Sequence, residues 1–367
     1  MKFSCTQANL NKGINLVGKI VSAHGTLPIL NNILLTTDSG RVKISATDLE
    51  IGINTWIGAK VESEGSITIP ARLIQEFINT NNDETVSLKL ENTTLNLASK
   101  KYKANIKGID ASEFPVIPNI KKNVFAEISA TDLGKALSQV AFASAIDETR
   151  PVLMGVLFKF EKNELKVVAT DSYRLAEKTI KLEKPPVRDA QLIMPQRAIL
   201  ELNRVLSGQE GKVEMYLEEN QILFVLGEIE FTSRLIEGSF PDYTQIIPQK
   251  NTTEAIISKD DFANSIKMAS FFARESANNI KLKIGKEELQ IVAASPQIGD
   301  NISSLNAKVT GPVMEISFNA KFILDFLNVI NAEKVSISSS DKASPAVFRA
   351  AGDNDYVYII MPLRIEE

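Results

Sequence analysis

The sequence predicts three similar α+β domains, because three short patterns recur along the chain in the same order. Each pattern returns after about a third of the 367 residues, and self-similarity at a fixed period indicates a repeated folding unit. Each copy is predicted to run helix, strands, helix, strands, in domains 1–120, 121–250 and 251–367. The polar links 118–124 and 248–253 mark the boundaries. One large domain with accidental echoes is the alternative, and three patterns in order in each copy argue against it.

The first pattern is the start of a helix. Thr6, Ser129 and Ser258 each stand four residues before an apolar residue, and further apolar residues follow at helical spacing. These apolar positions are Leu10, Ile14 and Val17; Leu133, Leu137 and Val140; and Phe262, Ile266 and Ala269. A hydroxyl at this place can accept a hydrogen bond from a free backbone N–H group of the first turn. We therefore expect a capped helix at the beginning of each domain.

The second pattern is a strand that runs into a tight turn. It is ISATDLE at 44–50, VVATDSYR at 167–174 and IVAASPQ at 291–297. Asp48 and Asp171 could in principle form a general acid and base, but the third copy has Ser295 at this position. Asp in a turn hydrogen-bonds to its own backbone. We therefore interpret both acids as turn residues.

The third pattern is a strand that enters a second helix. It is ITIPARLIQEFI from Ile67, LIMPQRAILELN from Leu192 and EISFNAKFILDFL from Glu315. Proline suits the start of a helix, where its missing N–H costs nothing, and Asn319 takes this place in the third copy. The apolar pairs expected to face one way are Leu73 with Phe77, Ala198 with Leu202, and Phe322 with Phe326.

The composition limits the possible functions. A single histidine, His24, and a single cysteine, Cys5, leave little material for a metal site, a Cys-His pair or a disulfide. No nucleotide-binding or nucleophile-elbow motif occurs. We therefore expect no cofactor and no catalytic residues. No apolar run is long enough to span a membrane, and the N-terminus has no secretory signal, so we expect a cytoplasmic protein. The net charge of −4 counts against a compact sequence-specific DNA binder.

Seven segments resemble the beta subunit family of bacterial DNA polymerase III, the DNA sliding clamps. They are MKF at the start, TLPILNNILL (26–35), ATDLE (46–50), VVATDSYRLA (167–176), EGSFPDYTQIIP (237–248), FNAKFILDFLN (318–328) and YIIMPLR (358–364). They span the whole chain in register, which makes the resemblance specific.

The resemblance implies three DNA-clamp domains, each with two helices packed on antiparallel sheets. Two chains would form a head-to-tail homodimer with pseudo-sixfold ring symmetry, whose helices line a central channel. Such a ring is a non-enzymatic processivity factor for DNA replication. The implied partners are encircled double-stranded DNA, the replicative polymerase, an ATP-driven clamp loader, and other polymerases and repair proteins. No membrane is expected.

A clamp needs a cationic channel, because phosphate contacts are independent of sequence and allow sliding. The helix windows 7–21, 71–80, 131–146, 196–207, 259–275 and 320–332 hold ten basic and seven acidic residues. The helices thus carry +3, which leaves −7 for the rest of the chain. The predicted channel residues are Lys12, Lys19, His24, Arg150, Arg197, Arg204 and Lys267. The alternative is that these are ordinary solvated helix faces, and that His24 is a solvated loop side chain.

The resemblance also implies a pocket for partner peptides between the second and third domains. Its predicted residues are Leu153, Thr170, Ser172, Tyr173, Arg174, Leu175, Pro241, Ile246, Asn319, Phe322, Ile359, Met361, Pro362, Leu363 and Arg364. An apolar groove containing a flexible methionine suits several related peptides. Gln245 and the extension 365–367 can alter the peptide preference. The alternative is that these residues only seal a domain junction.

The implied dimer contact joins the strand around Ala104 and Ile106 to the first helix of the third domain. Phe271 and Phe272 take the matching positions on that helix. Neighbours on a helix point in different directions, so both rings cannot face one core. Aromatic side chains are enriched at interface centres, which favours one of them as a contact to the partner subunit.

Two other classes of protein remain open from the sequence. One is a three-domain scaffold or peptide-binding protein that never encircles DNA, and the other is an enzyme whose site is not recognised.

Overall fold

The computed structural model describes residues 1–21, 27–120 and 123–363. It forms two compact units, one made of Met1–Thr131, Glu183–Val187 and Arg197–Leu235, and the other of Asp132–Leu182, Arg188–Gln196 and Ile236–Glu367. The predicted central domain therefore contributes to both units. Its β-rich halves belong to different sheets, as shown below.

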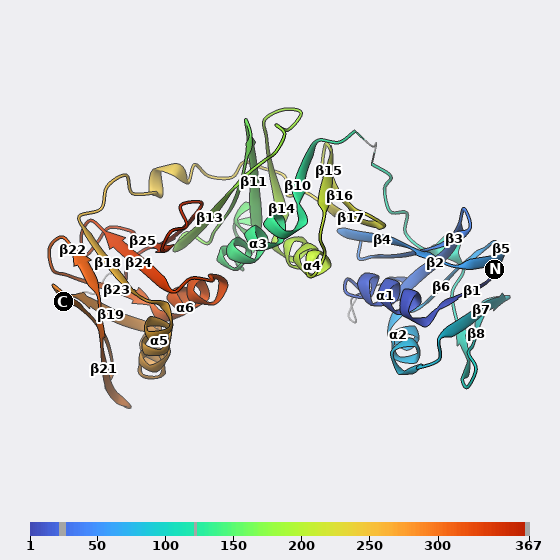
Figure 1. The fold of residues 1–367 in the computed structure, drawn as a ribbon, viewed down its shortest axis with the longest axis horizontal. Helices are drawn as coiled ribbons and strands as arrows, with labels where there is room; N and C mark the ends of the chain where they lie inside the picture. Colours follow the sequence, from blue (N-terminus) through green and yellow to red (C-terminus); the bar gives the residue numbers. More distant parts are fainter. Residues whose placement is uncertain (22–26, 121–122, 364–367) are drawn as a thin grey trace. The chain divides into compact units, whose positions relative to one another are not determined.

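Six α-helices lie in the described part of the chain, at the places that the two helix patterns predict (Figure 1). They are α1 (Gln7–Val17), α2 (Ala71–Thr80), α3 (Ala130–Val140), α4 (Gln196–Leu206), α5 (Lys259–Ala273) and α6 (Ala320–Val329). Thr6 caps α1 by accepting a hydrogen bond from the Asn9 N–H (3.2 Å), and Ser258 caps α5 in the same way. Several helices end earlier than predicted, in turns or 3-10 segments.

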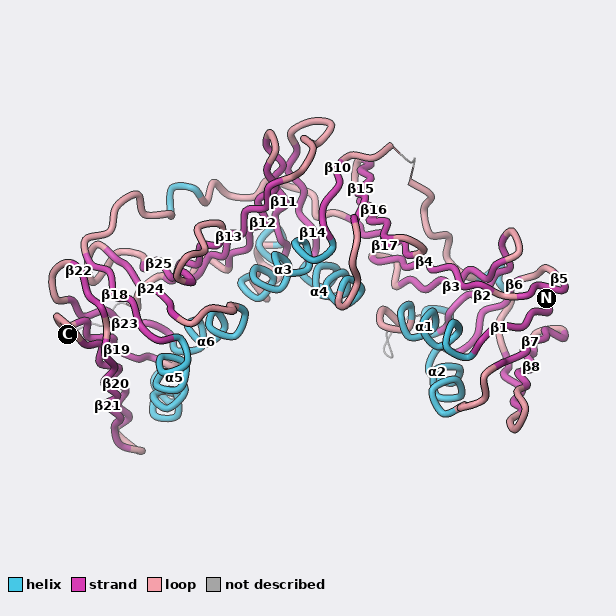
Figure 2. Tube along the Cα trace, viewed as in Figure 1, coloured by secondary structure: helices cyan, strands magenta, loops and turns pink. Residues whose placement is uncertain are grey.

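The first unit contains two antiparallel sheets, of five strands (order β5-β1-β7-β8-β9) and eight strands (order β10-β15-β16-β17-β4-β3-β2-β6). The strands are β1 (Lys2–Thr6), β2 (Asn32–Asp38), β3 (Arg41–Thr47), β4 (Ile51–Gly58), β5 (Lys60–Ser63), β6 (Ser66–Pro70), β7 (Thr85–Glu91), β8 (Thr94–Ala98), β9 (Lys103–Lys107), β10 (Ala126–Ser129), β15 (Lys212–Glu218), β16 (Gln221–Leu226) and β17 (Ile229–Arg234). In Figure 2, α1 and α2 lie beside these strands, and α1 packs on both α2 and β4.

The second unit also contains two antiparallel sheets, of nine strands (order β14-β11-β12-β13-β26-β25-β24-β18-β22) and four strands (order β21-β20-β19-β23). The strands are β11 (Gly155–Glu161), β12 (Glu164–Thr170), β13 (Arg174–Lys181), β14 (Ala190–Pro195), β18 (Thr253–Ser258), β19 (Asn279–Ile284), β20 (Glu288–Ser295), β21 (Gly299–Asn306), β22 (Lys308–Thr310), β23 (Met314–Asn319), β24 (Lys334–Ser339), β25 (Ala346–Ala350) and β26 (Tyr356–Ile360). Helix α5 packs on α6 and on β20.

The eight- and nine-stranded sheets each continue across a predicted domain boundary. In the first unit, β4 of the first domain pairs with β17 of the second, with Gly52 opposite Thr232. In the second unit, β13 of the second domain pairs with β26 of the third, with Leu175 opposite Ile359. A shared sheet satisfies backbone groups that would otherwise form exposed edges. Neighbouring domains are therefore joined by main-chain hydrogen bonds as well as by the connecting segments.

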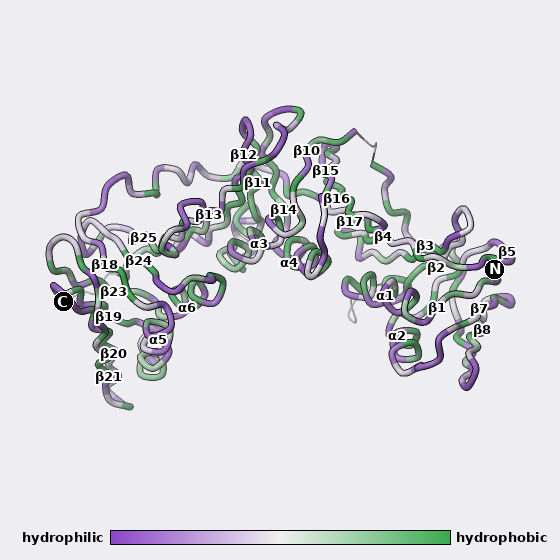
Figure 3. The backbone as a smooth tube through the Cα atoms, in the orientation of Figure 1, coloured by the Kyte–Doolittle hydropathy of each residue, from purple (hydrophilic) through white to green (hydrophobic). Residues whose placement is uncertain are grey.

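The buried faces of the helices match the predicted apolar spacing at their starts. All nine residues of the first pattern, from Leu10 to Ala269, are fully buried. The predicted pair Leu73 and Phe77 does not form the core face of α2: that face is formed by Ala71, Ile74 and Ile78, whereas Leu73 is 50% exposed and Phe77 is half-buried. Figure 3 shows the hydrophilic colour gathered at hairpin tips such as the one between β7 and β8.

Candidate functional site

The A-T-D sequence folds into the same turn in both copies. The hydroxyl of Thr170 donates to the Arg174 carbonyl (2.7 Å), and the Asp171 carboxylate accepts from the Tyr173 and Arg174 N–H groups (2.9 and 3.0 Å). Ser172 has a φ of 77°, in the left-handed region. Because the acid is used by its own turn, the structural interpretation of Asp171 is confirmed. The tight turn presents Tyr173 to solvent with 65% of its surface exposed.

The first copy repeats these contacts at residues 47–51. The Thr47 hydroxyl donates to the Ile51 carbonyl (2.8 Å), and Asp48 accepts from the Glu50 and Ile51 N–H groups (3.0 and 2.7 Å). Leu49, with a φ of 79°, takes the place of Ser172. In the third copy the Ser295 hydroxyl accepts from the Gln297 N–H (3.3 Å), so the same turn function is kept by a neutral side chain.

Arg174 fixes one wall of the predicted peptide pocket. Its guanidinium forms ion pairs with Asp171 (2.9 Å) and Asp325 (2.5 Å), and donates to the carbonyl of Phe142 (2.8 Å). It also lies over the Phe322 ring, 4.5 Å from the centroid. Only 8% of the side chain is exposed. Ion pairs and hydrogen bonds on several sides offset the cost of burying this charge and hold the guanidinium in one place.

Beneath the predicted pocket residues lies a buried apolar cluster that contains three of them, Leu153, Leu175 and Ile359. The other buried members are Leu157, Val168, Ile193, Phe240, Tyr243, Val347 and Val357. All seven were missed from the sequence, because burial in a strand does not show which strands meet. Phe240 and Tyr243 lie in the FPDY segment, which marked the region but not their position in the cluster.

The rim of the pocket is apolar and accessible. Met361 is 37% exposed and Ile246 is 38% exposed, and Pro241 is also exposed. The Met361 N–H donates to the Tyr173 carbonyl (2.8 Å), which fixes Met361 beside the turn. We call this surface, formed by Leu153, Tyr173, Arg174, Leu175, Pro241, Ile246, Phe322, Ile359 and Met361, the β13–β26 groove.

The remaining predicted pocket residues surround the groove. Asn319 caps α6 by accepting from the Lys321 N–H (2.9 Å), and the Leu363 N–H donates to the Ser317 carbonyl (2.9 Å). Pro362 is half-buried, and Arg364 lies outside the described residues. Gln245 donates to Asp242 (2.9 Å). Asp325, 151 positions after Arg174, has no sequence signal that links it to this site.

The predicted channel residues of the first unit differ in how free their charges are. Arg197 forms an ion pair with Asp48 (2.7 Å), and Arg204 forms one with Glu201 (2.6 Å). The Lys19 ammonium donates to the Arg204 carbonyl at the end of α4 (3.1 Å). Lys12 is exposed and forms no ion pair with another described residue. Three of the four predicted channel residues in this unit thus have part of their charge or hydrogen-bonding capacity used within the chain.

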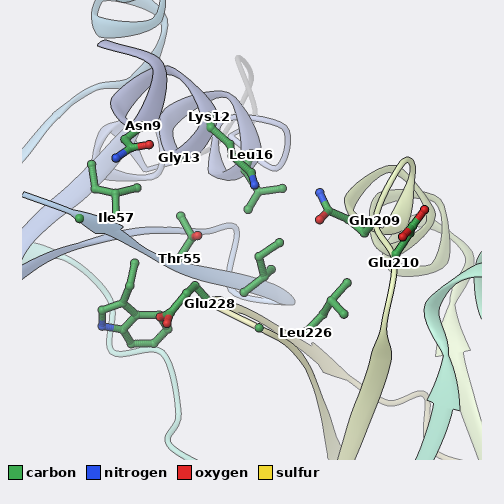
Figure 4. A pocket seen from close by; sticks show the side chains of 14 residues that line it. Asn9, Lys12, Gly13, Leu16, Thr55, Ile57, Gln209, Glu210, Leu226 and Glu228 are labelled. Atoms are coloured by element: carbon green, nitrogen blue, oxygen red, sulfur yellow. The ribbon is translucent and has the colours of Figure 1, made fainter. Parts of the chain in front are cut away.

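Lys12 also lines an open pocket of about 360 Å³. Figure 4 shows α1 on one side of this pocket, with Asn9, Lys12 and Leu16, and the β16–β17 turn on another, with Leu226 and Glu228. Lys12 lies on one side of the pocket, and Glu210 and Glu228 lie on the other. The lining therefore carries charges of both signs.

Of the other three predicted channel residues, two lie in the second unit and one is not described. Lys267 is exposed on α5. Arg150 precedes the 3-10 helix Pro151–Met154 and donates to the Ser172 hydroxyl (3.0 Å), which places it next to the β13–β26 groove. His24 lies outside the described residues. The six α-helices contain eight basic and six acidic residues, so their net charge is +2 rather than the predicted +3.

The predicted dimer residues lie on an edge strand and on a helix. Ala104 and Ile106 belong to β9, an edge of the five-stranded sheet. Ile106 is only 2% exposed and packs in its own domain, so an interface there would use the backbone edge. On α5, Phe271 is 44% exposed and Phe272 is half-buried. Strand β21, which was not predicted as a contact, is an edge of the four-stranded sheet with Ile302 62% exposed.

Comparison with known families matches all three domains. The models of the N-terminal, central and C-terminal domains of the DNA polymerase III beta subunit match residues 1–118, 127–242 and 244–364. The chain belongs to the DNA polymerase III beta subunit family. The resemblance drawn from the seven segments is confirmed, as is the three-domain clamp fold. The members of this family are sliding clamps, non-catalytic processivity subunits of the polymerase.

Similar proteins agree over the full length. The beta sliding clamp of Bacillus subtilis is 33% identical, over 99% of this chain and 100% of its own, and that of Staphylococcus aureus (strain Mu50) is 31% identical over 99% of both. A crystal structure of the Bacillus subtilis clamp has a TM-score of 0.95 at 32% identity and covers both chains completely. A Pseudomonas aeruginosa clamp bound to griselimycin has a TM-score of 0.94 at 28% identity, also with complete coverage. No helix in the described ranges is long and apolar enough to cross a membrane.

Proposed function

We propose that two copies of this chain form a head-to-tail ring that encircles duplex DNA and tethers a replicative polymerase to it. The observation that carries the proposal is the match of all three family domains in order along the whole chain. Three domains in each of two chains suit a closed pseudo-sixfold ring, which a head-to-tail contact gives when its rotation closes. We keep the domain boundaries at residues 120 and 250 and place the ring in the cytoplasm.

The channel would hold DNA by topology and weak electrostatic attraction. We propose that Lys12, Lys19, His24, Arg150, Arg197, Arg204 and Lys267 face the DNA. Lys12 and Lys267 support this role best. Each is exposed, and neither forms an ion pair with another described residue. Arg197 and Arg204 share their charge with acids. Phosphate contacts of this kind carry no sequence information, which is what sliding requires.

The β13–β26 groove would bind partner peptides. A buried apolar base, an exposed Tyr173 and Met361, and a fixed Arg174 wall support this role. Apolar anchors give affinity, while a methionine can repack around related sequences. We include Thr170, Ser172, Asn319, Pro362, Leu363 and Arg364 in the site. Its partners would be the polymerase, the ATP-driven clamp loader, and other polymerases and repair proteins.

The dimer contact would join the β9 edge around Ala104 and Ile106 to α5 at Phe271 and Phe272. The free edges of β9 and β21 and the exposed Phe271 ring support this assignment. Pairing of two edge strands would satisfy their unpaired backbone groups.

DNA topology provides the test. The chain is incubated with a clamp loader, ATP and nicked circular DNA, and bound protein is measured by gel filtration before and after the circle is cut once. We expect retention on the circle and release on linear DNA, because only a ring is held by the closed path. Equal retention on both forms would contradict encirclement and favour the scaffold alternative.

A further inference from the structure

We propose that the chain carries a second peptide site, where β4 of the first domain meets β17 of the second. We call it the β4–β17 pocket; it is formed by Leu49, Glu50, Gly52, Val116, Ile117 and Arg234. Its occupant would be a partner segment with an apolar side chain next to a carboxylate. The inference rests on the proposed role of the β13–β26 groove, because the two places share one backbone framework.

The same backbone framework builds both sites. Each begins with a Thr-Asp turn whose hydrogen bonds match, and whose third residue is left-handed, Leu49 at 79° and Ser172 at 77°. Each turn enters a strand that pairs with the last strand of the next domain. The Arg234 N–H donates to the Glu50 carbonyl (2.9 Å), as the Met361 N–H does to the Tyr173 carbonyl.

The segments that link the domains also correspond. Residues 114–118 are FPVIP, and residues 240–248 are FPDYTQIIP. Phe114 is buried like Phe240, and Pro115, Val116, Ile117 and Pro118 line the β4–β17 pocket. Val116 is 90% exposed and Leu49 is 46% exposed. The pocket therefore has the apolar rim that characterises the groove.

Three substitutions change what the site would accept. Gly52 stands in the place of Leu175, so β4 projects no side chain at this position. The Ile117 side chain packs over it instead, because a Cβ on Gly52 would lie 2.9 Å from Ile117. The pocket is about 90 Å³, far below the roughly 300–1,000 Å³ typical of small-molecule sites. We infer room for one apolar side chain of a peptide lying across the surface.

The other two substitutions add charge at the rim. Arg234 stands in the place of Met361, and Glu50 in the place of Tyr173. Arg234 is exposed and forms no ion pair with another described residue. A guanidinium binds carboxylates in a planar two-bond arrangement, so an acid in the peptide would complement it. The preference for an acid depends on Arg234 alone, because Glu50 at the same rim carries the opposite charge.

Methyl NMR of the full-length dimer can test the two sites together. The probe is the peptide acetyl-Ser-Gly-Leu-Glu-Leu-Gly-Ser-amide, compared with the same peptide carrying Lys in place of Glu. We expect the Glu peptide to shift the methyl signals of Leu49, Val116 and Ile117. In Arg234→Glu its affinity should fall at least about fivefold, and the Lys peptide should bind better. Arg188→Glu, a matched change at an exposed arginine outside the pocket, should leave both affinities unchanged.

A second variant covers the case that Arg234→Glu disturbs the sheet. Val116→Ser alters a side chain that is 90% exposed and should weaken binding without changing the remaining spectrum. Shifts only at Leu175, Ile246 and Met361 would overturn the second site and leave the proposed function standing. Shifts only in the β4–β17 pocket would support the second site and contradict peptide binding by the β13–β26 groove. The inference would be overturned if the Arg234→Glu variant bound the Glu peptide as tightly as the unchanged protein does. It would also be overturned if the same methyl signals shifted when the protein was concentrated without peptide.

Discussion

Arg174 joins three segments that are far apart in the sequence. Its partners Asp171, Asp325 and Phe142 come from a turn, from α6 and from the segment after α3. Removal of a buried charge leaves its partners buried and unpaired, which costs far more than loss of an exposed pair. The same residue forms a wall of the proposed β13–β26 groove, so we expect both stability and partner binding to depend on it.

We expect Arg174→Ala to lower the free energy of unfolding by about 3 kcal/mol, because Asp171 and Asp325 would remain without a cation. The matched control is Arg72→Ala, which removes the ion pair with Glu76 from a side chain that is 92% exposed and should cost less than about 1 kcal/mol. Urea unfolding followed by circular dichroism measures both. An equal loss in the two variants would show that the Arg174 contacts contribute no more than a surface pair.

Helix α5 has a buried face and an exposed aromatic residue. Phe262, Ile266 and Ala269 are fully buried in the third domain. Phe271 is 44% exposed, with the Arg274 guanidinium 5.4 Å from its ring centroid. Aromatic side chains are enriched at interface centres. We therefore propose that this face of α5 contacts the partner subunit.

Replacement of Phe271 and Phe272 by Ala should weaken the dimer, with Phe271→Ala alone raising its dissociation constant about tenfold, as a loss of about 1.4 kcal/mol would. The half-buried Phe272 should affect folding as well. Leu73→Ala, which removes a side chain that is 50% exposed on α2, is the matched control. Sedimentation velocity over a concentration series measures the dimer. An unchanged profile for the double variant would remove α5 from the interface.

The whole molecule is built so that domains share sheets. The boundary between the two compact units runs through the central domain, because β17 pairs with β4 and β13 pairs with β26. A partner groove at such a junction uses residues from two domains. The chain end contributes through the bonds of Met361 and Leu363 to Tyr173 and Ser317.

Deletion of residues 361–364 should abolish stimulation of polymerase processivity while the dimer persists, because it removes part of the groove and no predicted dimer residue. Deletion of 365–367 is the control and should leave stimulation in place. Primer extension on a long single-stranded template and sedimentation measure the two properties. Loss of the dimer in the first variant would show that the groove is misplaced.

Local chemistry in the sequence determined the repeat, the helix starts and the turns. Apolar spacing located Leu10, Ile14 and Val17 in the core, and Asp48 and Asp171 bond to their own turns as the pattern predicts. These features depend on residues only a few positions apart. The resemblance added the groove and ring surfaces, and their roles stay predictions.

Only the tertiary structure decided which distant elements meet. It paired β4 with β17, brought Asp325 to Arg174, and left Leu73 in solvent although its spacing suits a core. It also revealed the β4–β17 pocket. The physical reason is that a local pattern fixes which side chains share a face, whereas burial and pairing depend on the segment that covers that face. In this chain that segment lies more than a hundred residues away at both junctions.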